Sequence, residues 1–434
     1  MSHDPADDGG LAMFDEDDLE DGENRTVVDN SFWSQPKIPA YPALAIFGRF
    51  EILGRIAREE DLRHPAAREV QSDGSVRHVV LKRVLPEMAD NPDFLSMFLD
   101  EGRTAVRLYH ANVCHVYESG EVDGTAFMAL EWVYGTSLDD VITLAAARGT
   151  TLPWPIAVEI VAQVASALEY VHHAKGPSGR PLNIVHRDVS PHNVMLSWTG
   201  SVKLLDFGIA KTSADEGGGE TVGKYGYMSP EQAQSRPIDA RSDLFALGVV
   251  LFEALTGRPL YDRPTVLETL SAIVREPVPS LAQLRPDLPP ALDHIVARAL
   301  AKSPAQRWES AGELRAALKQ VLRAHNQLVI DKRIALTMDG LFTAAEKAPL
   351  KPDAQQLSGS FAALSAPAEQ VTYETFKHES EPPPSLRGAP SGHSTGRSTA
   401  GGAQRSRVLL YAALVVLFAV AAGIGAATML WLRS

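Results

Sequence analysis

The sequence predicts an α+β protein built as two lobes or two domains with tails, and three observations lead to this prediction. The chain has 434 residues, of which 45% are hydrophobic, enough to bury a sizeable core. From about Phe50 to Leu322, strand-like and helix-like patterns alternate and are separated by short turns. An uncharged apolar run from Val408 to Leu432 predicts one C-terminal transmembrane helix.

The composition excludes several classes of function. A formal net charge of -13 argues against a nucleic-acid partner, because neutralising phosphates needs clustered Lys and Arg. The acidic surplus more simply keeps the protein soluble. Cys114 is the only cysteine, so the chain can form neither an internal disulfide nor a cysteine-rich zinc site. We therefore expect the main domain to lie in a reducing compartment, the cytosol.

The N-terminal segment, residues 1–43, is predicted to be an acidic disordered tail. It contains DPADDGG and FDEDDLEDGEN, which combine high negative charge with few large apolar groups. The segment has neither the basic region nor the apolar run of a secretory signal peptide, so we expect none.

Residues 326–406 are predicted to be a Pro/Ser/Gly/Ala-rich juxtamembrane linker. The stretch PPPSLRGAPSGHSTGRSTAGG has too few large apolar groups to offset the entropy of ordering. Residues 408–432 then supply the roughly 20 apolar residues that a membrane crossing needs. Arg405 and Arg407 precede this run, and the positive-inside tendency places the main domain in the cytosol, with Arg433 as a weak opposing charge. We expect a single-pass anchor in the plasma (inner) membrane.

The predicted membrane helix carries small residues at regular spacing. Ala419, Gly423 and Ala427 recur every four positions, which allows two helices to approach closely. A homodimer and the ordinary small residues of a spanning helix both explain this pattern. Only two residues follow Leu432 in the sequence, so we expect any signal to arrive from the cytosol or through the helix itself.

The segment HVVLKRVL predicts a strand with a lysine on an apolar face. Alternation with a period of two places Val80, Lys82 and Val84 on the same side, and the β-branched residues favour a strand. A lysine in such a setting needs a nearby anionic partner.

The following segment, DNPDFLSMFLDEGRTAVRLYH, predicts a helix. Asp90 or Asn91 can cap its N-terminus, and Pro92 suits the first turn. Its apolar stripe at helical spacing comprises Phe94, Phe98, Ala105 and Leu108. Glu101 falls inside this stripe, where a carboxylate needs a counter-charge, and Lys82 is the nearest candidate. By itself this pattern fits a structural ion pair as well as a functional one.

Three motifs between His186 and Glu231 carry the chemistry. HRDVSPHN runs from His186 to Asn193, SVKLLDFG from Ser201 to Gly208, and GYMSPE from Gly226 to Glu231. In this order and at these separations they resemble the signature set of protein kinases, specifically the bacterial Hanks-type serine/threonine kinases.

The resemblance extends from about Phe50 to Leu322 and implies the bilobal protein-kinase fold. We therefore expect a kinase domain at 44–325, with a small β-rich N-lobe at about 44–133 and a larger helical C-lobe at about 134–325. The alternation of Val202, Leu204 and Asp206 is consistent with this, because Asp206 would emerge at the end of a strand and point into a cleft.

The resemblance also implies roles for individual residues. Asp188 would orient and deprotonate the substrate hydroxyl, and Lys82, locked by Glu101, would hold the α- and β-phosphates of ATP. Asn193 and Asp206 would bind Mg²⁺, with Mn²⁺ as an alternative, since Mg²⁺ prefers oxygen ligands.

Further positions follow from the same resemblance. The adenine would bind the backbone from Glu131 to Val133, with Leu130 guarding the back pocket, and Ile56 and Ala57 would also contact ATP. The residues with implied structural roles are His186, Glu231, Asp243 and Arg307. His172, His173 and His192 lack a companion pattern for metal binding, so we expect them to be packing or surface residues.

The glycine-rich lid of the family is degenerate in this chain. In GRFEILGRIAREEDLRHPAAREV, Ala57, Glu59 and Leu62 occupy the positions of the three glycines. Side chains there crowd the approach of backbone to phosphate, and Glu59 or Glu60 would repel the anionic oxygens. A membrane-tethered pseudokinase scaffold is therefore the alternative function.

A second departure lies beside the catalytic loop. Most serine/threonine kinases have Lys where this chain has Ser190, and Thr where it has Lys224. Lys224 could supply the missing positive charge from the opposite loop, or it could reach into solvent. Within the segment, Thr221 is the best candidate for phosphorylation, because a phosphate there could order the loop against Arg187.

These observations predict an active enzyme that transfers the γ-phosphoryl group of ATP to Ser or Thr hydroxyls of proteins, including its own. The pseudokinase scaffold would explain the degenerate lid. A third alternative, a tethered adaptor acting through its tails, would leave the whole set of motifs unexplained.

Overall fold

The computed structural model describes residues 43–56, 65–84, 89, 91–206, 222–347 and 350–351. All of them lie in the first of the chain's two structural units, Met1–Lys377. The predictions for the acidic tail up to residue 42, for Ala57 and Thr221, and for the membrane helix at 408–432 fall outside these residues.

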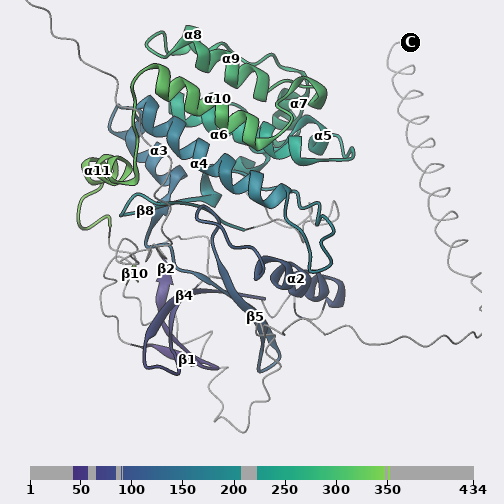
Figure 1. Ribbon diagram of the computed structural model, residues 1–434, viewed down its shortest axis with the longest axis vertical. Helices are drawn as coiled ribbons and strands as arrows, with labels where there is room; N and C mark the ends of the chain where they lie inside the picture. Colours follow the sequence, from purple (N-terminus) through teal and green to yellow (C-terminus); the bar gives the residue numbers. More distant parts are fainter. Residues whose placement is uncertain are drawn as a thin grey trace, which may run out of the picture. The chain divides into compact units, whose positions relative to one another are not determined.

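The small lobe is built on one antiparallel sheet, in which the strand order is β1-β2-β3-β4-β6-β5 and β10 pairs with β2 (Figure 1). The strands are β1 (Ala45–Phe47), β2 (Phe50–Ile56), β3 (Pro65–Val70), β4 (Val76–Arg83), β5 (Val116–Val122), β6 (Thr125–Glu131) and β10 (Leu350–Lys351). One face of the sheet buries an aromatic cluster, in which Phe47 and Phe50 meet the ring of Phe127 edge-on at 5.6 and 5.5 Å between centroids.

Helix α2 (Pro92–Ala105) covers the other face of this sheet and packs against β5 and β6. Asn91 caps it as predicted, since its side chain accepts hydrogen bonds from the backbone N–H groups of Asp93 and Phe94. The helix lies very close to β5, because a Cβ atom at Gly102 would come within 2.5 Å of the Ser119 Cβ. A glycine is therefore needed at this contact.

The large lobe consists mainly of helices. They are α3 (Leu138–Ala147), α4 (Trp154–His172), α5 (Pro230–Ala233), α6 (Ala240–Thr256), α7 (Val266–Arg275), α8 (Leu281–Leu284), α9 (Pro290–Ala299), α10 (Ala311–Ala324) and α11 (Asp331–Leu341). Short 3₁₀ helices lie at η2 (Pro191–Asn193), η5 (Val222–Tyr227) and η6 (Pro304–Gln306). A small antiparallel sheet joins β7 (Gly135–Ser137), β8 (Val194–Ser197) and β9 (Val202–Leu204). The resemblance to protein kinases predicted a small β-rich lobe and a larger helical lobe, and the structure confirms both.

Helices α4 and α6 form the centre of the large lobe. Most side chains of α4 are fully buried, and α6 carries a run of buried apolar residues from Leu244 to Leu255. Among the residues that the structure describes, α4 is the one helix long and apolar enough to cross a membrane, and 72% of its most apolar window is buried inside the lobe. It is a core helix, apolar on nearly every side because other helices surround it.

The linker predicted for residues 326–406 is wrong at its N-terminal end. Residues 331–341 form α11, which packs beside α3. Ile334 and Met338 are at most 1% exposed and belong to the core of the large lobe, together with Phe342. Their spacing of four residues is a helical stripe. The correction arises because the Pro- and Gly-rich composition of the later residues does not extend back to this short amphipathic segment.

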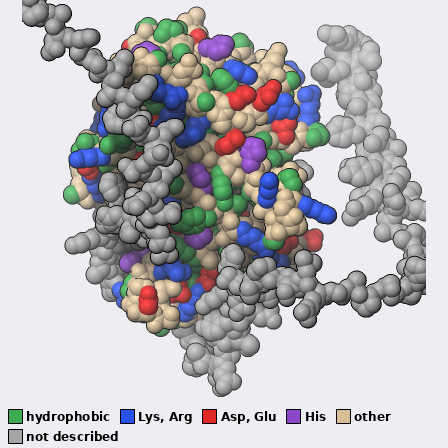
Figure 2. All heavy atoms as spheres, in the orientation of Figure 1, with side chains coloured by type: hydrophobic (Ala, Val, Ile, Leu, Met, Phe, Trp, Pro, Cys, Tyr) green, Lys and Arg blue, Asp and Glu red, His purple; other side chains and the backbone are tan. Residues whose placement is uncertain are grey.

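Charged side chains of both signs lie next to one another over the described surface that faces the viewer in Figure 2. Among the described residues, oppositely charged side chains form pairs such as Arg241 with Asp239 at 2.7 Å and Arg285 with Asp287 at 2.7 Å. Exposed pairs of this kind contribute little to stability. The buried apolar clusters described above therefore account for most of the stabilisation of the fold.

Candidate active site

Lys82 lies on β4 and extends from the small lobe toward the large lobe. It shares its face of the strand with Val80 and Val84, as predicted, while Val79 and Leu81 on the opposite face are fully buried. The Lys82 Nζ atom lies 3.1 Å from the Oδ1 atom of Asp206, which follows β9 in the large lobe. This ion pair joins residues that are far apart in the sequence and belong to different lobes.

The charge of Lys82 is held by several carboxylates. Burial by itself would lower the pKa of Lys82, but the negative charges of Asp206, Glu101 and Asp188 outweigh burial, and its pKa is raised. The side chain is therefore a cation at neutral pH and can bind an anionic ligand. A lysine that stays charged in a partly buried site is suited to binding phosphate.

Glu101 lies on the packed face of α2, and only 7% of its surface is exposed. The sequence predicted it as the counter-charge of Lys82. In the structure the ion pair of Lys82 is with Asp206, and Glu101 adds its negative charge to the surroundings of the same lysine. The carboxylate is thus held close to the site by the packing of α2 on β5 and β6.

The loop between α4 and η2 carries His186, Arg187 and Asp188, and its backbone is hydrogen-bonded to Asp243 of α6. Asp243 is 1% exposed and accepts hydrogen bonds of 2.8 Å from the backbone N–H groups of both His186 and Arg187. His172 Nε2 also lies 2.8 Å from Asp243. A buried helix therefore fixes the backbone just before Asp188, which limits the positions that its carboxylate can reach.

His186 links this loop to the segment that carries Asp206. Its Nε2 atom lies 2.9 Å from the backbone carbonyl of Leu205, and its Nδ1 atom is 3.3 Å from the backbone N–H of Asp188. Burial is the main influence on the ring and lowers the pKa of His186. The ring is therefore neutral, with the proton on Nε2 donated to Leu205 and Nδ1 accepting from Asp188.

Asn193 ties the two acidic residues together. Its side-chain nitrogen donates to the backbone carbonyl of Asp188 at 2.8 Å. The backbone carbonyl of Asn193 accepts from the backbone N–H of Leu205, the neighbour of Asp206, at 2.8 Å. Because the amide nitrogen is used in this way, the amide oxygen is the atom left to ligate a cation. An amide oxygen and a carboxylate from adjacent segments are the donor set that Mg²⁺ prefers, so these residues fit the implied ion.

Two residues of the site adopt an unusual backbone conformation. Arg187 has φ of 67° and Asp206 has φ of 43°, in the left-handed region that non-glycine residues rarely occupy. Such conformations persist where surrounding contacts hold them, and they are common at functional sites. At Arg187 the backbone N–H is held by Asp243, and its carbonyl accepts from the Gln232 side chain at 3.2 Å.

The segment implied for adenine binding lies at the end of β6. Leu130 and Val133 are each 8% exposed and belong to the apolar cluster beneath α2. The backbone N–H of Glu131 donates to the backbone carbonyl of His115 at 2.7 Å, and the Glu131 carbonyl accepts from the Cys114 thiol at 3.5 Å. Because a thiol is a weak donor, the carbonyl is the backbone group of Glu131 suited to adenine. The Glu131 carboxylate instead accepts from Lys203 Nζ at 2.9 Å, a contact that the sequence did not predict.

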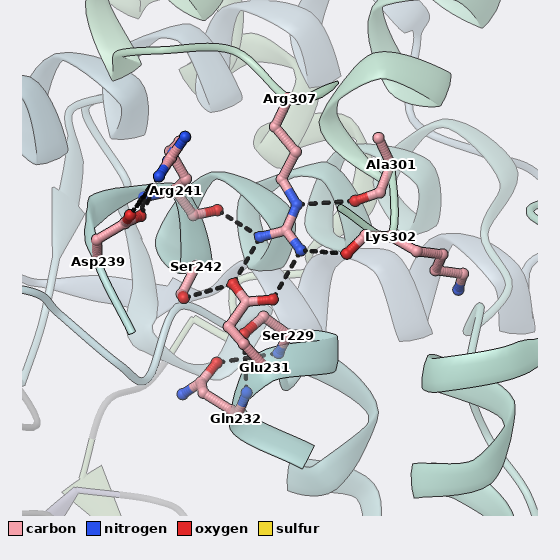
Figure 3. A network of polar contacts seen from close by, with 9 residues as sticks. All are labelled: Ser229, Glu231, Gln232, Asp239, Arg241, Ser242, Ala301, Lys302 and Arg307. Carbon is pink, nitrogen blue, oxygen red and sulfur yellow. Dashed lines mark hydrogen bonds and ion pairs between the residues drawn. The ribbon is translucent and has the colours of Figure 1, made fainter. Parts of the chain in front are cut away.

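In the large lobe, Glu231 and Arg307 form a bidentate ion pair with distances of 2.7 and 2.8 Å (Figure 3). Arg307 is 1% exposed, and it also donates to the backbone carbonyls of Arg241, Ala301 and Lys302. Burial would raise the pKa of the Glu231 carboxyl, but hydrogen bonds from Arg307 and Ser242 and the charge of Arg307 lower it. The pair fixes the start of α5 against α6 and the end of η6.

Some predicted residues lie at the edge of what the structure describes. Ile56 ends β2, but its side chain is not described, and Ala57 and Thr221 lie outside the described residues. Ser190 is 3% exposed. The side chain of Lys224 is not described, so its predicted exchange of roles with Ser190 remains a prediction.

His172 was expected to be a packing or surface residue, and the structure shows it packed, with a side chain that is only 5% exposed. Its contact with Asp243 was not predicted, because the two residues lie 71 positions apart in the sequence. His172 is the last residue of the apolar helix α4.

The comparisons with known proteins agree with this geometry. The family profile described as the protein kinase domain matches residues 66–322. Tyrosine-protein kinase MasK of Myxococcus xanthus is 37% identical over 287 residues, which cover 65% of this chain and 44% of that protein. Serine/threonine-protein kinase PknD of Mycobacterium tuberculosis is 35% identical over 291 residues, which cover 66% of this chain and 40% of that protein.

Two further relatives add to this result. Serine/threonine-protein kinase PknB of Mycobacterium tuberculosis is 36% identical over 260 residues, which cover 58% of this chain and 39% of that protein. The crystal structure of the Mycobacterium tuberculosis PknI kinase domain has 29% identity and a TM-score of 0.50, and the match covers 65% of this chain and 100% of that one. The chain spans about two fifths of the length of the curated relatives that it matches.

Proposed function

Because the chain belongs to the bacterial Hanks-type protein kinase family, we propose that it transfers the γ-phosphoryl group of ATP to serine or threonine hydroxyls of proteins, including its own. The observation that carries the proposal is the Lys82–Asp206 ion pair of 3.1 Å, which brings a phosphate-binding cation and a metal-binding carboxylate together between the lobes. Asp188 is joined to the same centre through His186 and Asn193.

In the proposed reaction, Asp188 orients the substrate hydroxyl and accepts its proton as the oxygen attacks the γ-phosphorus. A bond forms between the hydroxyl oxygen and phosphorus, the bond from phosphorus to the bridging oxygen breaks, and ADP leaves with the electron pair. Asp243 contributes by holding the backbone before Asp188, so the carboxylate needs little reorganisation during the reaction.

Lys82 would bind the α- and β-phosphates once ATP displaces its contact with Asp206, and Asp206 and Asn193 would then hold Mg²⁺. The ion would neutralise charge on the phosphate oxygens. Lys82 stays cationic at neutral pH because Asp206, Glu101 and Asp188 raise its pKa, so it can stabilise the negative charge that develops during transfer.

The pseudokinase alternative draws its support from the degenerate lid, where Ala57, Glu59 and Leu62 replace glycines. Against it stand Lys82, Asp188, Asn193 and Asp206, whose contacts with one another or with adjoining backbone are the ones that phosphoryl transfer needs. A scaffold without catalysis would have no use for this arrangement. We therefore favour an active enzyme.

Tyrosine specificity is the second candidate, because one of the relatives is named a tyrosine kinase while PknD and PknB are named serine/threonine kinases. The names of PknD and PknB support the serine/threonine proposal, whereas Ser190, at a position where most serine/threonine kinases have Lys, does not add to it. The two specificities differ in the phosphoamino acid produced, which makes them easy to separate.

We further propose that the enzyme is anchored in the plasma membrane by residues 408–432 with the kinase domain in the cytosol. The support is the uncharged apolar run and the arginines at 405 and 407 that precede it. The same helix is proposed to bring two copies together through Ala419, Gly423 and Ala427. Unchanged cross-linking after Gly423→Leu would refute the dimer.

Autophosphorylation of the full chain with labelled Mg-ATP tests the proposed function. Asp188→Asn should abolish labelling while leaving the fold intact, because it removes the proton acceptor but keeps the size of the side chain. Asp123→Asn is the matched control, since Asp123 is exposed in the β5–β6 turn with φ of 49°, a conformation that Asn tolerates. Equal labelling of wild type and Asp188→Asn would favour the scaffold. Phosphotyrosine as the main product would overturn the serine/threonine assignment.

A further inference from the structure

The chain continues beyond residue 322, where the match to the family profile ends, and this continuation contacts both lobes. Helix α11 lies beside α3 in the large lobe, and β10 lies beside β2 in the small lobe (Figure 1). We call residues 326–347 and 350–351 the strap; it comprises α11, the turn after it and β10.

The strap is anchored firmly at the start of α11. The backbone carbonyl of Asp331 lies so close to the β8–β9 turn that a Cβ atom at Gly200 would come within 1.8 Å of it. Gly200 also has φ of 93°, which side chains disfavour. The turn just before the segment of Asp206 is therefore shaped to receive α11.

The next part of the strap is held by an aromatic and ionic cluster. The rings of Phe342 and Trp198 meet edge-on at 5.3 Å between centroids, and Lys347 lies over the same Trp198 ring at 5.6 Å. Lys347 also pairs with Asp339 of α11, and Glu346 pairs with Arg148 after α3 at 3.4 Å. Trp198 follows β8, so the cluster keeps the strap on the large lobe up to residue 347.

The last part of the strap pairs with the small lobe. Leu350 lies opposite Ile56, and Lys351 lies opposite Arg55, in an antiparallel arrangement. β1 pairs with β2 from Phe50 to Ile52, so β10 covers the edge of β2 beyond the end of β1. An uncovered strand edge is open to pairing with other chains, and its coverage by the strap stabilises the end of β2.

The end of β2 is the position in the small lobe from which the sequence of the phosphate lid continues, at Ala57. We propose that the strap fastens the large lobe to the end of β2, and that by restricting the motion of one lobe against the other it increases the affinity for ATP. A ligand that binds between two elements has less conformational entropy to offset when a third element already ties them together. The inference rests on the proposed kinase function.

The first test uses the full chain with Leu350→Pro/Lys351→Pro, because proline removes the backbone N–H groups that strand pairing needs. We expect KM for ATP to rise about fivefold and kcat to change by less than about twofold, since pre-organisation acts on binding more than on the chemical step. Gln355→Pro/Gln356→Pro, the same kind of change placed after β10, is the control and should behave as wild type.

Hydrogen exchange of residues 50–56 provides a readout that does not depend on catalysis. The amides at the end of β2 should exchange faster in Leu350→Pro/Lys351→Pro than in the control. If exchange and KM are both unchanged, the strap does not act on β2. A lower KM for ATP in the variant would show restraint instead of support and would also overturn the proposal. If wild type has no activity, the proposed function fails, whereas the exchange experiment still decides whether the strap pairs with β2.

A milder variant tests the middle of the strap without a change in the backbone. Lys347→Met removes the ammonium group that contacts Trp198 and Asp339, and we expect KM for ATP to rise about twofold with kcat unchanged. Lys332→Met, at an exposed position of α11, is the matched control. Equal effects of the two lysine variants would refute a specific role for this contact.

Discussion

Replacing Arg307 with methionine should lower the free energy of unfolding of the large lobe by about 3–5 kcal/mol, the loss expected when one partner of a buried ion pair is removed. Methionine keeps much of the length of the side chain but has no donor. The Glu231 carboxylate, on a residue that is 6% exposed, would then keep the hydroxyl of Ser242 at 2.6 Å but lose its counter-charge.

The magnitude follows from the contacts that are lost. The guanidinium group donates to both oxygens of Glu231 and to three backbone carbonyls, at distances between 2.7 and 3.1 Å. Each buried acceptor left without its donor costs about 1–3 kcal/mol, and partial relaxation keeps the total below the simple sum. The double variant Glu231→Gln/Arg307→Met removes the stranded charge and should recover part of the loss.

The pH dependence of the loss is a second signature. In wild type the pKa of Glu231 is lowered from its ordinary value of 4.5, so its contribution to stability is present above that value and disappears as the pH falls through the lowered pKa. Without Arg307, burial would dominate and raise the pKa, and the folded variant would then bind a proton more tightly than the unfolded chain. The difference between wild type and variant should therefore shrink from about pH 8 to about pH 5.

Thermal unfolding followed by circular dichroism at the two pH values measures both effects. For a domain of this size, each kcal/mol corresponds to a shift in Tm of roughly 2–4 °C, so we expect Arg307→Met to lower Tm by roughly 6–20 °C near pH 8. A loss below about 1 kcal/mol, the worth of an exposed ion pair, would refute the reasoning, as would a loss that does not change with pH.

Three further predictions address other parts of the domain. Burial is the main cause that raises the pKa of Glu253 to about 7. Between pH 4.5 and pH 7 the folded state binds more protons than the unfolded state, so the free energy of unfolding falls by about 3 kcal/mol as the pH rises. Glu253→Gln should remove this fall, which denaturation at about pH 5 and about pH 8 measures. Gly102→Ala should push α2 away from Ser119, because the added Cβ would lie 2.5 Å from the Ser119 Cβ; we expect a loss of about 1–3 kcal/mol and a lower kcat/KM, whereas unchanged kinetics would disprove the need for close contact. His172→Phe should leave Asp243 short of one donor and lower kcat several-fold with KM for ATP unchanged, and a variant with wild-type kcat would show that His172 does not position the catalytic loop.

Individual helices and strands could be predicted from the sequence because they depend on residues close together in the chain. Asn91 and Pro92 mark the start of α2, and the alternation around Lys82 places it on one face of β4. These patterns depend on neighbours a few residues away, so a single sequence contains all the information needed. The motifs around Asp188 and Asp206 likewise led to the kinase family.

The tertiary structure decided what these residues contact. Asp206 forms an ion pair with Lys82 although the two are 124 residues apart in the sequence, and this pairing was not predicted. His172 proved to be a partner of Asp243 through the packing of α4 against α6. No periodicity in the chain contains such pairings, because they arise only when distant segments are brought together.

The strap illustrates the same division most clearly. It is richer in apolar residues than the Pro- and Gly-rich stretch that follows it, but the helical spacing of Ile334 and Met338 is a short signal, and residues 326–406 were predicted as a single linker. The strap adopts its structure because it contacts the rest of the fold at the backbone of Gly200, at the ring of Trp198 and at the edge of β2 beyond β1. A chain determines its own local preferences, but whether a short segment becomes ordered depends on the surfaces that the rest of the fold presents to it.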